Sequence, residues 1–159
     1  MNIVIADERD DPPSTQPADQ EGLAALARVV LQGELLPPTC EVTVTLVEPG
    51  EMARLNHRHL GNPGPTDVLS LPIEDLIPGE PPVVATDDPP LLIGDVVICP
   101  AVVAEHAAAH DVSLDDEMAL MVTHGLLHLL GYDHQGDAEA ARMESIERRY
   151  LTMVGRSRR

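Results

Sequence analysis

The spacing of apolar and polar residues along the chain predicts strands alternating with helices. The clearest strand covers 41–47, where Val42, Val44 and Leu46 alternate with threonines, as expected for a strand with one buried face. Other apolar runs have the length of strands and are bounded by turn residues. They predict three further strands, at 2–6, 67–73 and 91–99.

Segments in which apolar residues recur at helical spacing lie between these strands or after them. Apolar residues from Leu23 onward recur every three or four positions and predict a helix from about residue 21 to Gly33. Ser113, with Asp116 three residues later, is the expected N-terminal cap of a long apolar helix. Further helices are expected at about 51–59, 100–110 and 137–154, and Pro- and Asp-rich loops at 7–20 and 75–90.

The order of the elements indicates the fold class. Strands come first and helices dominate the end, with no internal repeat and no linker that would divide the chain. This order is typical of an α+β fold in which a single mixed β-sheet packs against helices. We therefore expect one domain over residues 1–159.

Composition adds expectations about the core and the compartment. Hydrophobic residues make up 43% of the chain but aromatic residues only 1%, so the core must be aliphatic, with Tyr132 and Tyr150 as the two tyrosines. Cys40 and Cys99 lie far apart in the sequence and are expected to be reduced and buried. The N-terminus is unlike a signal peptide, and no apolar run is long enough for a membrane span. A cytoplasmic protein without a membrane partner is expected.

Candidate chemistry concentrates in the stretch 121–134. His124 and His128 are four residues apart, so on a helix their imidazoles lie on one face. Gly131 can end that helix in the left-handed conformation and let the chain turn back toward His134. Three neutral imidazoles are a sufficient protein ligand set for zinc with one position left for water. The stretch therefore predicts one Zn²⁺ per chain on these three histidines, on a helix similar to that of the zinc proteases.

Other histidines are weaker candidates. Two histidines four residues apart also occur by chance as hydrogen-bonded core residues. His134, which follows Gly131, favours a metal site over that alternative for His124 and His128. His106 and His110 form a second such pair, but no third ligand follows a helix end. His57 and His59 would point to different sides of a helix and are expected at the surface or in a groove.

The residues beside the histidines bear on the reaction. Gly125 occupies the position where zinc proteases of the His-Glu-x-x-His kind carry their general base, which weakens a peptidase interpretation. Asp133 is a candidate for orienting a ligand imidazole, with a turn-forming role as the alternative. Thr66, Asp67 and Ser70 are candidates for lining the cleft, with a turn before a strand as their alternative. No catalytic group beyond a metal-bound water is assigned.

Three segments resemble the YbeY family of metal-dependent endoribonucleases. Residues 124–134 match its His-Gly-x-Leu-His-Leu-x-Gly-Tyr-Asp-His signature, residues 65–72 its Pro-Thr-Asp-Val-Leu-Ser-Phe-Pro segment with Leu71 for Phe, and residues 94–100 its Gly-Asp-Ile-x-Ile-Ser-Pro segment with Cys99 for Ser. Where relatives carry an aromatic residue and an arginine before the second segment, this chain has His59 and Leu60. Any phosphate contact made by that arginine is therefore unassigned here.

The resemblance implies a function and partners. It implies a single-strand-specific endoribonuclease in late 3′-end maturation of small-subunit ribosomal RNA and in ribosome quality control. Ribosomal RNA is the implied substrate, and small-subunit proteins or an assembly GTPase are the candidate partners. Nickel and copper remain alternatives to zinc, because imidazole sites accept them as well.

The charge of the chain argues against an RNA substrate. The formal net charge is −17, whereas phosphate contacts by basic side chains normally supply most of the affinity for nucleic acid. A local patch would be needed, for which Arg54, Arg58 and the otherwise polar C-terminal tail at 156–159 are the candidates. Two alternatives therefore stay open, a zinc hydrolase or peptidase with a non-RNA substrate and a non-catalytic ribosome-assembly factor.

Overall fold

The computed structural model describes residues 1–11, 16–85 and 87–159, so parts of the two predicted loops at 7–20 and 75–90 lie outside the described residues. Every predicted strand and helix is present, and each end falls within one or two residues of its expected position. The elements are β1 Asn2–Asp7, α1 Gln20–Gly33, β2 Cys40–Leu46, α2 Pro49–Leu60, β3 Val68–Pro72, β4 Leu91–Ile98, α3 Pro100–Ala109, α4 Leu114–Leu129 and α5 Asp137–Met153.

The strands form one mixed sheet in the order β1-β2-β4-β3. β1, β2 and β4 are parallel to one another, and β3 runs antiparallel to β4 at the edge. The predicted α+β class with a single mixed sheet is confirmed. Because β3 is an edge strand, one side of its backbone is not paired within the sheet.

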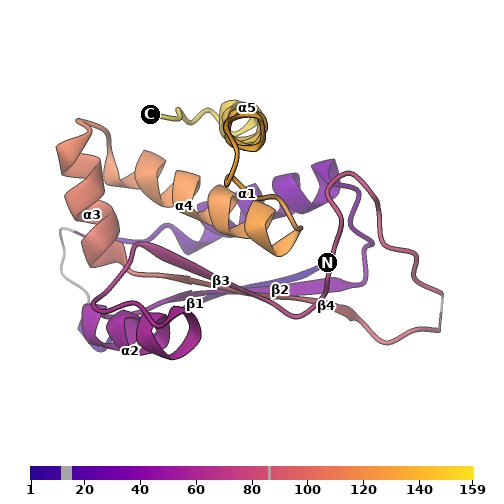
Figure 1. Ribbon diagram of the computed structural model, residues 1–159, viewed down its shortest axis with the longest axis horizontal. Coiled ribbons are helices and arrows are strands. Elements are labelled where there is room, and N and C mark those ends of the chain that lie inside the picture. The colour runs from indigo at the N-terminus through magenta and orange to yellow at the C-terminus, as the bar shows by residue number, and fades with distance from the viewer. Residues whose placement is uncertain (12–15, 86) are drawn as a thin grey trace.

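Helices cover both faces of the sheet (Figure 1). α1 and α4 pack on one face through an aliphatic core that includes Val44, Val96 and Leu126, and α5 lies on the outer side of α4. α2 packs on the opposite face against a smaller cluster that contains Met52 and Leu69. α4 is thus enclosed between the sheet and α5, which explains why most of its residues are buried.

Local sequence explains where α4 begins. The Ser113 hydroxyl accepts a hydrogen bond from the backbone N–H of Asp116 at 3.1 Å, as the predicted cap requires. Carboxylates fill the first turn, where they interact favourably with the positive end of the helix dipole.

Within the described part of the chain, no helix combines the length and the apolar character needed to cross a bilayer. Both cysteines are free and buried, as expected.

Candidate metal centre

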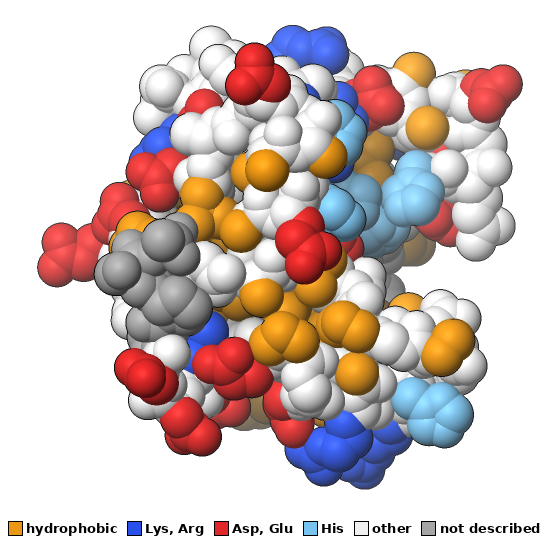
Figure 2. Space-filling view, turned by 90° about the vertical axis from the view of Figure 1, so that its left-hand side faces the viewer, with side chains coloured by type: hydrophobic (Ala, Val, Ile, Leu, Met, Phe, Trp, Pro, Cys, Tyr) orange, Lys and Arg blue, Asp and Glu red, His pale blue; other side chains and the backbone are white. Residues whose placement is uncertain are grey.

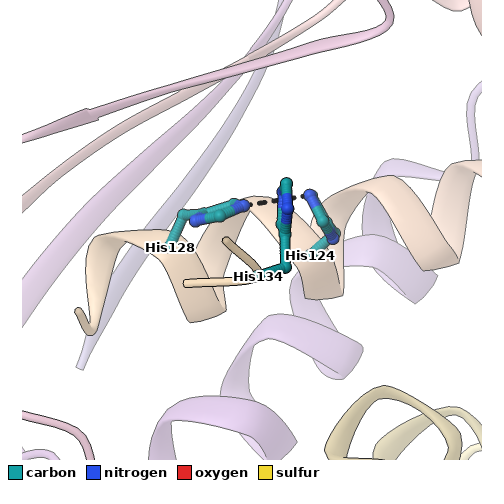
Figure 3. Close-up of side chains that lie close together, drawn as sticks. All are labelled: His124, His128 and His134. Carbon is teal, nitrogen blue, oxygen red and sulfur yellow. Dashed lines mark hydrogen bonds between the residues drawn. The ribbon is translucent and has the colours of Figure 1, made fainter. Parts of the chain in front are cut away.

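Three histidine side chains meet at the C-terminal end of α4 (Figure 3). His124 and His128 project from one face of α4, and His134 approaches them from the segment after the helix. One ring nitrogen from each lies within 4.8 Å of the other two. Nε2 of His124 and Nε2 of His128 are 3.0 Å apart. Two nitrogens bound to one tetrahedral zinc are about 3.3 Å apart, so this geometry suits a metal ion with little rearrangement.

The turn that brings His134 to the helix begins at Gly131. Gly131 has φ of 87°, the left-handed conformation that glycine adopts without strain. Its N–H donates to the carbonyl of His128, and the N–H of Tyr132 donates to the carbonyl of Leu127, the two bonds of a Schellman motif. The helix end expected from the sequence is therefore present, and it reverses the chain immediately before the third histidine.

A buried carboxylate orients the first histidine. Oε1 of Glu147, on α5, lies 2.8 Å from Nδ1 of His124. A carboxylate accepts, so Nδ1 of His124 carries the proton and its Nε2 keeps a lone pair directed at the other histidines. Burial alone would raise the pKa of Glu147, but hydrogen bonds from His124 and Arg158 outweigh it and hold that pKa below its usual value. Carboxylates in this position are typical of metal-bound histidines.

The Glu147 contact was missed by the sequence analysis, although a signal existed. Met143, Glu147, Tyr150 and Leu151 are the buried residues of α5, at the spacing of one helix face. Glu147 occupies an apolar position of this face. Its side chain is only 2% exposed, and a buried carboxylate needs a partner. Its identity as the partner of His124 could be found only from the packing of α5 on α4.

The environment of His128 also favours a neutral ligand. Burial, followed by the neighbouring His124 and His134, lowers the pKa of His128. A lowered pKa keeps the imidazole unprotonated to lower pH, so its lone pair stays available to a metal across the neutral range. The donor set therefore fits a divalent metal that prefers nitrogen ligands, zinc among them.

The three histidines line an open cavity of about 430 Å³, whose other wall is β3 and the residues around it. Asp67 and Ser70 are among its lining residues, as is Leu60 at the end of α2. In the space-filling view several pale-blue histidine side chains gather at a hollow of the surface, and another lies apart at the lower edge (Figure 2). The cavity gives a substrate access to the histidines from the β3 side.

Of the candidate polar residues, Asp67 and Ser70 line this cavity, whereas Thr66 and Asp133 are not among its lining residues. The Ser70 hydroxyl donates to the carbonyl of Gly125 at 3.0 Å and so ties β3 to α4. The Thr66 hydroxyl lies 3.1 Å from Oδ1 of Asp67, and Oδ2 of Asp67 lies 3.1 Å from Nδ1 of His106. Asp133 is exposed, and its carboxylate accepts from the N–H of His134. The structure thus places Asp67 in the cleft and Asp133 in the turn.

The remaining four histidines are not part of the triad. Nδ1 of His110 contacts the carbonyl of His106, and among the described residues the histidine triad is the one cluster suited to a metal. His57 and His59 are exposed on α2. The C-terminal tail lies beside α5, whereas α2 lies on the opposite side of the sheet (Figure 1), so the candidate arginines of these two segments do not form one patch.

Gly125 has a packing role that explains why no glutamate stands there. A Cβ on this residue would lie 2.5 Å from Cγ1 of Val96 and 3.2 Å from Cγ2 of Val68. α4 therefore presses directly on β3 and β4 at this point, which sets the distance between the histidines and the edge strand. A larger side chain at this position cannot enter the metal cleft without moving the helix off the sheet.

Both tyrosines of the chain converge on one carboxylate beside the centre. The Tyr132 hydroxyl donates to Oε2 of Glu34 at 2.6 Å, and the Tyr150 hydroxyl donates to Oε1 of the same residue. Burial and then Glu34 raise the pKa of Tyr132 to about 12, so its hydroxyl remains a donor at neutral pH. Glu34 thereby fastens the turn that carries His134 to the end of α1.

We expect Tyr132→Phe to lower the free energy of unfolding by about 1–2 kcal/mol, because the Glu34 carboxylate loses one hydrogen-bond donor. Urea unfolding of the metal-free protein measures this loss. Exposed Thr152→Val, which removes a hydroxyl bonded only within α5, is the control and should change stability by less than about 0.5 kcal/mol. An unchanged midpoint for Tyr132→Phe would contradict the role given to Glu34.

Comparisons with known proteins agree with this geometry. A model of the family described as Endoribonuclease YbeY matches residues 5–155. The Endoribonuclease YbeY of Thermobifida fusca is 45% identical over 157 residues, covering 99% of this chain and 96% of that protein. That of Acidothermus cellulolyticus is 41% identical over 160 residues, covering 100% and 94%. The solution structure of TM1509 from Thermotoga maritima is 27% identical, with a TM-score of 0.59 over 96% of this chain and 88% of that chain. The chain therefore belongs to the Endoribonuclease YbeY family.

Proposed function

We propose that this protein is a zinc-dependent endoribonuclease that cleaves single-stranded ribosomal RNA during late 3′-end maturation of the small-subunit RNA. The observation that carries the proposal is the convergence of His124, His128 and His134 in an open cavity, in a chain whose relatives are named endoribonucleases. The proposal treats residues 1–159 as one catalytic domain that acts in the cytoplasm. Small-subunit proteins or an assembly GTPase are the proposed partners.

The three histidines are the proposed metal ligands. The three imidazoles would hold a zinc ion, which would supply a Lewis acid and lower the pKa of a bound water toward neutrality. Glu147 fixes the orientation of His124, and the lowered pKa of His128 keeps a second ligand neutral. His124 and His128 can therefore bind the metal without first losing a proton from the nitrogen that faces it.

Asp67 is the proposed additional acid or base. It lines the same cavity as the three histidines, whereas Asp133 is engaged in the turn. Thr66 and His106 each contact one oxygen of Asp67 and hold its carboxylate in place. A carboxylate in this cleft is suited to take a proton from a ribose hydroxyl or to deliver one to a leaving oxygen.

An acidic chain needs a local site for the phosphates of RNA. The last turn of α2 carries His57, Arg58 and His59, and the last residue of the helix, Leu60, lines the cavity. Arg54 on the same helix pairs with Glu51 at the surface, which leaves Arg58 as the better placed of the two arginines. We propose that this end of α2 contacts the RNA backbone beside the cleft, where a few cations offset the overall negative charge.

RNA cleavage by untagged protein tests the function. Single-stranded and duplex fragments of ribosomal RNA, beside a panel of peptides, are incubated with protein as purified, after chelation and after zinc is restored. We expect cleavage of single-stranded RNA that is lost with chelator and regained with zinc, with the peptides intact. Peptide cleavage without RNA cleavage would favour the alternative zinc hydrolase. Metal binding without any cleavage would favour the assembly-factor role.

A further inference from the structure

The C-terminal tail folds back onto α4 and α5. Its three arginines each lie against carboxylates of these helices, with Arg156 3.4 Å from Asp115, Arg158 2.6 Å from Glu147 and Arg159 2.9 Å from Glu117. The ribbon shows the tail beginning at α5 and ending on the same side of the sheet (Figure 1). The tail expected to be merely polar is therefore an ordered part of this surface.

Two of these arginines neutralise buried carboxylates in different surroundings. The side chain of Glu147 is 2% exposed and that of Glu117 is 1% exposed, so each depends on its arginine as a partner. Glu117 lies in the first turn of α4 and has no contact with the histidines. Glu147 binds Arg158 through Oε2 and His124 through Oε1. Only the Arg158–Glu147 pair is connected to the proposed metal centre by a hydrogen bond to one of the three histidines.

Arg158 itself is held in place. Its Nε donates to Oε2 of Glu147, its Nη1 donates to the carbonyl of Arg159, and its Nη2 lies 3.4 Å from Oε1 of Glu144. The side chain is 18% exposed and lines a second cavity, of about 260 Å³, together with His124 and His134. A cation fixed on three sides can determine where the Glu147 carboxylate points.

We propose that Arg158 is a positioning residue of the metal centre, acting through Glu147 to orient His124. The proposal rests on the metal site proposed above. A carboxylate bound from two opposite sides keeps one orientation, and the imidazole hydrogen-bonded to it is held with its free nitrogen toward the other ligands. Without the guanidinium, the buried carboxylate is fixed only by the histidine that it should orient. Loss of such an outer partner typically weakens metal binding by about 10–100-fold.

Zinc affinity in matched variants tests this role. R158Q and R159Q each remove an arginine from a buried glutamate, but only the first touches a partner of a ligand. Zinc dissociation constants are measured by chelator competition, and the visible spectrum of the cobalt-loaded protein reports the ligand geometry. We expect R158Q to bind zinc at least about 10-fold more weakly with an altered cobalt spectrum, and R158K to recover part of the loss. R159Q should bind zinc as the wild type does.

A double-mutant cycle separates this route from a general loss of stability. Because Arg158 acts through Glu147, R158Q introduced into E147Q should change zinc affinity by less than about twofold. This double variant leaves no unpaired buried charge, so it carries the test if R158Q alone does not fold. Equal zinc affinities of R158Q, R159Q and wild type would overturn the proposal for Arg158, as would a large further loss in the E147Q background. Failure of the wild type to bind zinc would instead overturn the metal site itself.

Discussion

His128→Ala is expected to abolish metal binding while leaving the chain folded. His128 is one of the three proposed ligands and the one whose pKa burial lowers, so the variant keeps only two of these imidazoles. Zinc content should fall from about one ion per chain to almost none. RNA cleavage should fall with it, because no other described cluster can hold the metal.

Stability measurements separate metal loss from unfolding. The wild type should gain about 2.7 kcal/mol when free zinc is 100-fold above its dissociation constant, and the variant should gain nothing. Metal content is measured by mass spectrometry on untagged protein, with circular dichroism to verify folding. His110→Ala, which removes an exposed imidazole at the end of α3, is the control and should retain the metal. Zinc bound equally by wild type and His128→Ala would exclude this histidine as a ligand.

The elements and the histidine cluster could be predicted because their signals are local. The alternation of apolar and polar residues predicted strands such as Cys40–Leu46, in which every second residue is buried as expected. The three histidines lie within the eleven residues 124–134, and a helix followed by a left-handed glycine is enough to bring them together. Geometry over so short a segment follows from helix spacing and one glycine turn.

The surroundings of the ligands depend on contacts between distant segments and could not be predicted in this way. Glu147 contacts His124 across 23 positions, and Glu34 contacts Tyr132 across 98. Such pairs depend on how α5 and α1 pack on α4, which no period in the sequence specifies. For Asp133 the sequence leaves an orienting role and a turn-forming role open, and the structure gives its carboxylate a contact within the turn. Buried charge at an apolar helix position was the available clue to Glu147.

Gly131→Ala is the second substitution from which we expect a large loss, of both stability and zinc affinity. It alters the turn between His128 and His134. Two costs combine at this residue. Its φ of 87° is strained for any residue with a Cβ, which costs roughly 1–2 kcal/mol. A Cβ would also lie 2.1 Å from the carbonyl oxygen of Leu76 in the segment after β3. Backbone atoms cannot withdraw as a flexible side chain can, so the turn itself must move.

Gly61 provides the matched control for this prediction. It ends α2 with φ of 70°, but apart from its chain neighbours no atom of the described residues lies within 4 Å of a Cβ placed there. Gly61→Ala should therefore lose only the cost of strain, about 1 kcal/mol, whereas Gly131→Ala should lose about 3 kcal/mol or more. Denaturant unfolding of the metal-free proteins measures both.

Zinc titration of the same two variants then shows whether the turn determines the position of the third ligand. In Gly131→Ala the movement that relieves the Leu76 contact also displaces His134, so zinc affinity should fall together with stability. In Gly61→Ala the histidines keep their positions and zinc affinity should match that of the wild type. Equal losses of stability in the two variants would mean that strain alone matters at Gly131. Unchanged zinc affinity in a destabilised Gly131→Ala would mean that His134 reaches the metal independently of the turn.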